Sequence, residues 1–92
     1  MDVSKYRRES DGVYIGPGGE KYIVDEIDGI KGNIKTASKM IAAYDRLKDK
    51  DDWTGDDPDE LRKGLASDQR ELEILTALKA AEQPYGSRAW FG

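Results

Sequence analysis

The spacing of apolar and polar residues changes along the chain, and each change indicates a different structural element. Two short runs of β-branched and aromatic residues, 13–15 and 22–24, flank the segment Gly16-Pro17-Gly18-Gly19. Proline presets one turn dihedral and glycine accepts positive φ at little steric cost, so this segment can reverse the chain. The pattern predicts a β-hairpin over residues 12–24.

A helical period starts at Ile27. From there, apolar residues recur at alternating spacings of three and four, which places them on one narrow face of a helix. The sequence therefore predicts a first helix over residues 27–48, with a stripe that packs against another helix. The stripe comprises Ile27, Ile30, Ile34, Ala37, Ile41 and Tyr44.

A second helix is predicted over residues 58–83. Asp57 can cap its first turn, and Pro58 suits the first helical position. Gln83 precedes Pro84, and helical backbone is disfavoured before a proline, so we expect the helix to end there. The apolar stripe of this helix comprises Leu61, Leu65, Leu72, Leu75 and Leu78.

The two predicted helices are joined by a short acidic loop, residues 49–57. Helices joined in this way most simply fold back on each other as an antiparallel pair. We therefore predict an α+β fold in a single small domain over residues 1–92. It consists of an N-terminal β-hairpin followed by an antiparallel two-helix hairpin, and it is mostly helical.

Composition indicates that this domain has a thin core. Leu, Ile, Val and Phe together number 17 of the 92 residues, about 18%, close to the level of roughly 20% below which disorder becomes an alternative. A chain of this size rarely draws more than ~3–5 kcal/mol from its own core. We therefore expect it to form a homo-oligomer or to bind a protein partner.

The residue types that are missing exclude many kinds of chemistry. The chain has no cysteine and no histidine, so it lacks the thiolate nucleophile and the commonest general base and zinc ligand. We expect no enzymatic activity, no cofactor and no dedicated metal site. A net charge of -4 also argues against direct nucleic-acid binding. No apolar run could span a bilayer and residues 1–10 lack the apolar centre of a signal peptide, so we expect a soluble, cytoplasmic protein with no membrane contact.

The acidity of the chain is concentrated in one segment, Asp49 to Glu60. It holds seven acidic residues and one lysine, a charge of -6, which leaves +2 for the rest of the chain. Three interpretations remain open: a solvated connection, a calcium loop similar to an EF-hand, or an acidic surface that mimics nucleic-acid charge and blocks a basic, nucleic-acid-binding protein. The candidate partner-binding residues in the loop are Asp49, Asp51, Asp52, Trp53, Asp56 and Asp57.

Within this loop, Trp53-Thr54-Gly55 resembles the W-x-G turn of the small helical-hairpin proteins of specialised bacterial secretion. The resemblance covers this tripeptide and the two-helix plan. The chain departs from that family because a strand hairpin precedes its first helix and because Ala89 stands where the C-terminal signal of the family has an acidic residue. We therefore assign the chain to no family on this motif.

The last residues, 84–92, are rich in aromatic side chains. These either dock back on the helical hairpin and enlarge its core, which we expect, or anchor a partner, as Trp, Tyr and Arg often do. The candidate partner-binding residues here are Tyr85, Arg88, Trp90 and Phe91.

Together these features favour binding over catalysis. We expect an assembly or adaptor protein that joins copies of itself or other proteins through its helical hairpin and aromatic tail. The alternatives are the acidic inhibitor of a nucleic-acid-binding protein and a helix-loop-helix that binds divalent cations.

Overall fold

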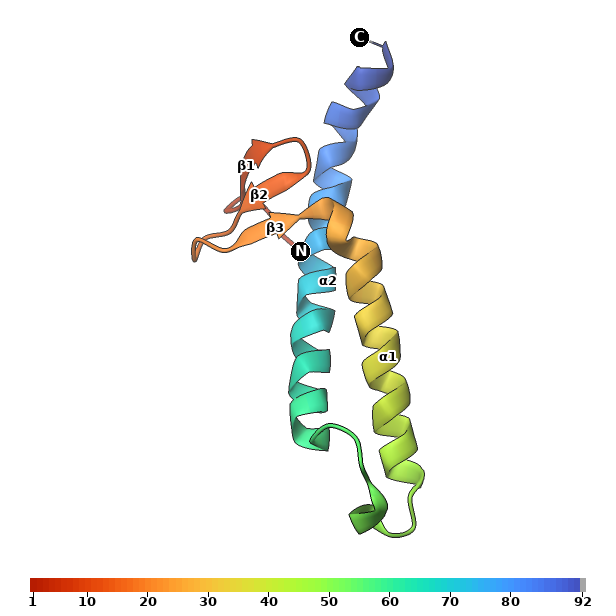
Figure 1. Cartoon of the computed structure of the whole chain (residues 1–92). Coiled ribbons are helices and arrows are strands. Elements are labelled where there is room, and N and C mark those ends of the chain that lie inside the picture. Colours follow the sequence, from red (N-terminus) through yellow and green to blue (C-terminus); the bar gives the residue numbers. More distant parts are fainter. Residues whose placement is uncertain (92) are drawn as a thin grey trace.

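A three-stranded antiparallel sheet forms the N-terminal part of the computed structural model, which describes the backbone of residues 1–91 and the side chains of residues 1–83 (Figure 1). The strands are β1 (Arg7–Ser10), β2 (Val13–Ile15) and β3 (Lys21–Ile23), in that spatial order. A helical hairpin follows the sheet, so the predicted α+β class is confirmed.

The predicted β-hairpin is present as β2 and β3. The amide of Gly16 donates to the carbonyl of Glu20 over 2.7 Å, and the amide of Gly19 donates to the carbonyl of Gly16 over 3.0 Å. Gly19 has φ of 87°, a value that glycine adopts far more readily than other residues. The Gly-Pro-Gly-Gly segment therefore makes the turn that its composition predicted.

β1 is an element that the sequence analysis missed. It pairs with β2, and Arg8 lies opposite Tyr14 across this pair. The strand reads RRES and has no alternation of apolar and polar residues, because one of its faces is solvated and the other carries Arg8. A turn through Gly12, at φ of 70°, connects β1 to β2.

The first helix is shorter than predicted and the second is longer. A short 3-10 turn, η1 (Val24–Glu26), leads into α1 (Ile27–Arg46). The predicted end at residue 48 is wrong because Leu47 already has extended backbone, with ψ of 133°. The following loop contains a second 3-10 turn, η2 (Lys50–Asp52), and then α2 (Pro58–Phe91) begins at the predicted proline.

The expected end of α2 at Gln83 is also wrong, because the helix continues through Pro84 to Phe91. Proline removes the hydrogen bond to the carbonyl of Ala80, but its fixed φ near about -65° is itself a helical value. The chain can therefore lose one hydrogen bond and still keep helical backbone. The predicted tail is thus the last part of α2, and it extends beyond the sheet at the end of the molecule opposite the interhelical loop (Figure 1).

α1 and α2 pack side by side and antiparallel, as predicted (Figure 1). Near the interhelical loop the Arg62 guanidinium donates to a carboxylate oxygen of Asp45 over 3.0 Å, so the end of α1 lies beside the start of α2. This end of the hairpin is far from the sheet, and the molecule is elongated, with extents of 60 × 28 × 18 Å.

The fully packed part of the core lies at the sheet end of the hairpin. Leu75 and Leu78 have no exposed surface and lie between the sheet and the start of α1. Burying such a side chain contributes about 1.5–3 kcal/mol. The buried core residues are Tyr14, Val24, Ile27, Ile74, Leu75 and Leu78, and Ile30 and Leu72 pack against them.

Gly32 weakens α1 without a compensating contact. A Cβ atom placed on it would have no neighbouring atom within 4 Å, and glycine costs about 1 kcal/mol relative to alanine inside a helix. Gly32→Ala should therefore raise the free energy of unfolding by about 0.5–1 kcal/mol. Urea denaturation followed by circular dichroism measures this change. An equal or lower midpoint would show that the glycine has a structural role in the monomer.

Candidate functional site

The interhelical loop forms a structured tip at one end of the molecule, made of residues 49–57. The rings of Tyr44 and Trp53 meet edge to face, with centroids 5.6 Å apart. The indole N–H of Trp53 donates to the backbone carbonyl of Asp56 over 2.7 Å. The Trp53 side chain is half-buried, and these two contacts hold the loop in place. We therefore assign Trp53 a structural role.

Lys50 caps the C-terminal end of α1 beneath this aromatic pair. Its ammonium group donates to the backbone carbonyls of Tyr44, Asp45 and Leu47 over 2.7, 3.0 and 3.0 Å. It also lies 4.8 Å from the centroid of the Tyr44 ring. The Tyr44 carbonyl also accepts from the amide of Leu47 over 3.1 Å. The last carbonyls of a helix lack the usual backbone donors one turn further on, and a cation complements the negative end of the helix dipole.

The acidic residues of the tip divide into two groups. The Asp49 carboxylate accepts from the amide of Asp51 over 3.0 Å, and the Asp57 carboxylate accepts from the amide of Asp59 over 2.9 Å. These two cap helical turns, the second being the predicted cap of α2. The carboxylates of Asp51, Asp52 and Asp56 are exposed and make no hydrogen bond or ion pair within residues 1–83. They are the acidic groups of the tip that stay open to solvent.

The acidic side chains of the tip were a candidate calcium loop, and their arrangement can be compared with one. In the described part of the chain, no three acidic side chains converge closely enough to hold a metal ion. The calcium-loop interpretation of the segment Asp49 to Glu60 therefore has no assembled set of ligands among the described residues.

The aromatic candidates lie far from this tip. The backbone of Tyr85, Arg88, Trp90 and Phe91 belongs to the last turns of α2, at the opposite end of the molecule (Figure 1). Their side chains lie outside the described residues, so the expectation that they dock on the hairpin stays a prediction. The two groups of predicted partner-binding residues therefore cannot form one continuous site.

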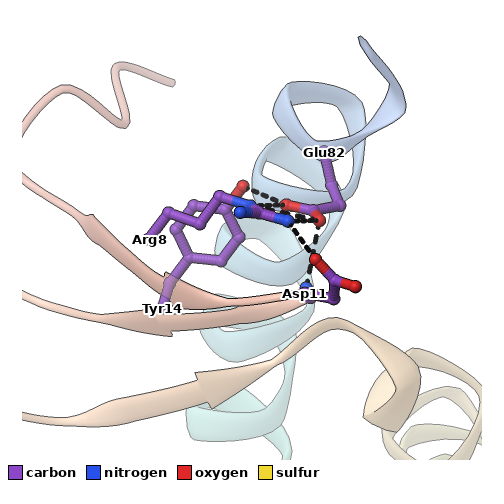
Figure 2. A network of polar contacts seen from close by, with 5 residues as sticks. Arg8, Asp11, Tyr14 and Glu82 are labelled. Carbon is purple, nitrogen blue, oxygen red and sulfur yellow. Dashed lines mark hydrogen bonds and ion pairs between the residues drawn. The ribbon is translucent and has the colours of Figure 1, made fainter. Parts of the chain in front are cut away.

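A third cluster, which the sequence analysis missed, joins the sheet to α2. Figure 2 shows the Glu82 carboxylate directed at the guanidinium of Arg8 and the hydroxyl of Tyr14. Arg8 donates through Nε over 2.9 Å and through Nη2 over 2.8 Å, and the Tyr14 hydroxyl donates over 2.6 Å. The amide of Gly12 donates to the same carboxylate over 3.1 Å. Arg8 also pairs with Asp11, at 2.6 Å.

This junction is well shielded and changes the acidity of its carboxylate. The side chains of Arg8 and Glu82 are 26% and 18% exposed. Hydrogen bonding from Arg8 lowers the pKa of Glu82 from 4.5 to about 2, against the effect of burial, which raises it, and with help from Tyr14 and Gly12. The carboxylate is therefore ionised at neutral pH. We assign it a structural role, because each of its partners holds the sheet against α2.

A shallow hollow of about 260 Å³ lies in the corner between β3 and α2. Lys21 and Arg70 line it together with Glu20 and Glu71, so positive and negative groups are balanced around it. This mixture gives the hollow no preference for a ligand of either charge.

Along the hairpin away from the sheet, the apolar stripes of both helices are only half-buried. We call this part, residues 34–44 of α1 with residues 61–72 of α2, the distal hairpin. Its stripe residues are Ile34, Ala37, Ile41 and Tyr44 on α1, and Leu61, Leu65 and Leu72 on α2, and each retains solvent exposure.

Comparison with known proteins identifies no relative: no family model matches the chain, and no curated protein or solved structure matches it. No helix in the described residues is both long enough and apolar enough to cross a membrane.

Replacing Glu82 tests the junction. Glu82→Gln removes the negative charge that pairs with Arg8 and that accepts hydrogen bonds from Tyr14 and Gly12. This change should lower the free energy of unfolding at pH 7 by about 1–3 kcal/mol. A carboxyl group whose pKa is depressed by folding stabilises the fold above its unfolded pKa. That contribution is lost as pH falls from about 4.5 to about 2.

Thermal melting across this pH range measures the effect. The difference in stability between wild type and Glu82→Gln should shrink as pH falls from about 4.5 to about 2. Other carboxylates titrate in both proteins, so the difference isolates Glu82. A constant difference over the whole range would contradict the proposed ion pairing.

The cap formed by Lys50 makes a separate prediction. Lys50→Met keeps a long side chain but removes the ammonium group, so the carbonyls of Asp45 and Leu47 lose this donor, while the carbonyl of Tyr44 keeps only the amide of Leu47. We expect the free energy of unfolding to fall by about 0.5–1.5 kcal/mol. Lys48→Met, at an exposed position two residues earlier in the chain, is the matched control and should melt like the wild type. Equal melting of the two variants would show that the cap contributes nothing.

Proposed function

We propose that this chain is a non-catalytic assembly or adaptor protein that binds other protein chains through its helical hairpin and its aromatic C-terminal residues. The observation that supports this proposal most strongly is the state of the distal hairpin. Its stripe residues are spaced as in a helix-packing seam, yet each of them remains only half-buried. A further layer of protein laid on this seam would remove the remaining apolar surface from water.

The hairpin is also suited to present a binding surface. It is fixed to the sheet by the buried core and by the Glu82 junction at one end, and the Lys50 and Trp53 contacts brace its tip at the other. A surface held in this way loses little conformational entropy when a partner binds.

To test the proposal, the 92-residue chain is tagged, immobilised and exposed to an extract of the native host. Ile41→Lys and Leu65→Lys place a charge on the seam, while Ala43→Lys places the same charge at an exposed position of α1. Captured proteins, copies of the chain included, should be lost with the two seam variants and kept with Ala43→Lys.

Helical circular dichroism spectra establish first that each variant is folded. If folded seam variants capture the same proteins as the wild type, the seam is not the binding surface and the proposal is wrong. The proposal also fails if the wild type captures nothing above an empty support.

A second candidate function rests on the acidic tip. The carboxylates of Asp51, Asp52 and Asp56 are exposed and unpaired within the described residues, on a loop that Trp53 and Lys50 hold in shape. An inhibitor that occupies a basic, nucleic-acid-binding groove needs such fixed negative charges. Asp49 and Asp57 serve as caps, so they contribute mainly to the shape of the tip.

Charge reversal tests this second function. The triple variant Asp51→Lys, Asp52→Lys, Asp56→Lys leaves both caps intact and should keep the wild-type helix content, because exposed charges contribute little to folding. If the tip mimics nucleic acid, the wild type captures nucleic-acid-binding proteins that duplex DNA elutes, and the triple variant captures none. Capture that survives the reversal would refute charge mimicry.

A further inference from the structure

The edge strand β3 leaves part of its backbone without a partner. The amide of Gly16 donates to the carbonyl of Glu20. The amide of Val24 donates to the carbonyl of Gly12. In an antiparallel ladder, residue pairs that exchange hydrogen bonds alternate with pairs whose amides and carbonyls point outward. Lys21 falls at an outward position of this alternation, so its N–H and C=O point away from β2.

Three backbone groups are therefore open at this edge of the sheet. They are the N–H and C=O of Lys21 and the N–H of Ile23, which points outward by the same alternation. The carbonyl of Ile23 belongs to η1, because Ile23 is the N-cap of that turn. Within the described residues, nothing pairs with the three open groups. The other edge, β1, is interrupted by a bulge between Arg8 and Ser10, which hinders the addition of a strand.

The open edge of β3 borders the hollow in the corner between β3 and α2. The strand lines it with residues 20–22, and α2 lines it with Ser67, Arg70, Glu71 and Ile74. These helix positions follow the spacing i, i+3, i+4 and i+7, so they form one face of α2. That face is turned away from the apolar stripe of the distal hairpin. A fourth strand laid about 4.8 Å from β3 would cross α2 here, on the side of the sheet nearest the distal hairpin (Figure 1).

The side chains of such a strand would point alternately toward α2 and away from it. The Tyr14 hydroxyl donates to Glu82 of α2, so this face of the sheet is turned to the helix. Tyr22 lies opposite Tyr14 and shares the face. The floor of the hollow is apolar on this side, because Ile74 is buried and Tyr22 is half-buried. The balanced charges around it suit a neutral peptide backbone.

Beside this floor α2 presents cations. A second hollow, of about 310 Å³, continues along the helix and is lined by Lys63, Ala66, Ser67 and Arg70. Lys63 pairs with Glu60 over 3.5 Å at the surface. The Arg70 guanidinium makes no hydrogen bond or ion pair within residues 1–83. Glu20 and Glu71 line the first hollow but not the second. An acidic side chain that faces α2 would therefore meet the cation of Arg70.

We propose that the edge of β3 binds an extended peptide segment of a partner protein, which adds a fourth strand to the sheet and directs an acidic side chain at Arg70. The open backbone groups select an extended chain, because a strand presents donors and acceptors at the repeat of residues 21 and 23. The site lies outside the seam and the C-terminal residues. This inference therefore goes beyond the proposed function and does not depend on it.

A proline at position 21 tests the backbone pairing. Lys21→Pro removes an N–H that β2 does not use, and edge strands tolerate proline in that orientation, so the variant should fold. Lys21→Ala removes the same side chain but keeps the N–H, and is the matched control. Phage that display short random peptides are selected on the immobilised wild-type chain, and the selected peptides are synthesised. Fluorescence anisotropy should show binding weakened about tenfold or more by Lys21→Pro and unchanged by Lys21→Ala.

The contact with Arg70 is tested with the same peptides, which should carry Asp or Glu. Arg70→Glu should weaken their binding about tenfold or more. Lys35→Glu makes the same charge change at an exposed position of α1 outside both hollows and should leave binding unchanged. Amide hydrogen exchange gives an independent measurement. The amides of Lys21 and Ile23 should exchange quickly in the free chain and slowly in the complex.

The outcomes that overturn the proposal differ from those that refute an adaptor. Equal binding by Lys21→Pro and Lys21→Ala overturns strand addition, and so does a selection that enriches no peptide. If Lys21→Pro fails to fold, an amide of Lys21 that still exchanges quickly in the wild-type complex overturns it. Equal binding by Arg70→Glu and Lys35→Glu overturns the acidic contact. None of these results affects capture through the seam, which the variants of the distal hairpin test separately.

Discussion

The packing of Leu75 and Leu78 between the sheet and the start of α1 is the contact on which the rest of the structure depends. These two side chains are the only fully buried ones in the described residues, and the other core residues surround them. A three-stranded sheet with strands of three or four residues is marginal alone, and so is an isolated pair of helices. Each becomes stable because the other covers its apolar face at this point.

The Glu82 carboxylate makes that packing specific. Apolar contacts resist sliding only weakly, whereas one carboxylate that accepts from Arg8, Tyr14 and Gly12 fixes the height of the sheet along α2. The junction also explains why β1 can be a charged strand. Its inward side chain, Arg8, pairs with the Glu82 carboxylate and needs no apolar neighbour. The polar network and the small core therefore act together, because the core supplies affinity and the network sets the register.

Several features could be predicted from the sequence because each depends on neighbouring residues. The Gly-Pro-Gly-Gly turn, the 3-4 spacing after Ile27 and the Asp57-Pro58 start of α2 are local signals, and the structure contains the corresponding elements. The features that were missed depend on distant residues. β1 has no apolar pattern because its inward position pairs with Glu82, and the end of α1 is set by Lys50 folding back on the helix. Sequence alone also could not show that Asp49 caps the turn at Lys50–Asp52, while the carboxylates of Asp51, Asp52 and Asp56 make no hydrogen bond or ion pair within residues 1–83.

The junction between the sheet and α2 has a consequence for how the chain folds. Arg8 and Glu82 are separated by 74 residues, and Tyr14 and Glu82 by 68, so the contact closes a loop that contains most of the chain. Closing such a loop lowers the entropy of the chain, and only the burial of the complete core offsets this loss. Contacts between residues so far apart in sequence also slow folding. During synthesis the strands emerge first but cannot dock until Glu82 has left the ribosome. We expect the sheet and the helical hairpin, which both depend on nearer contacts, to form first and only transiently, and the docking of the sheet on α2 to be the last step.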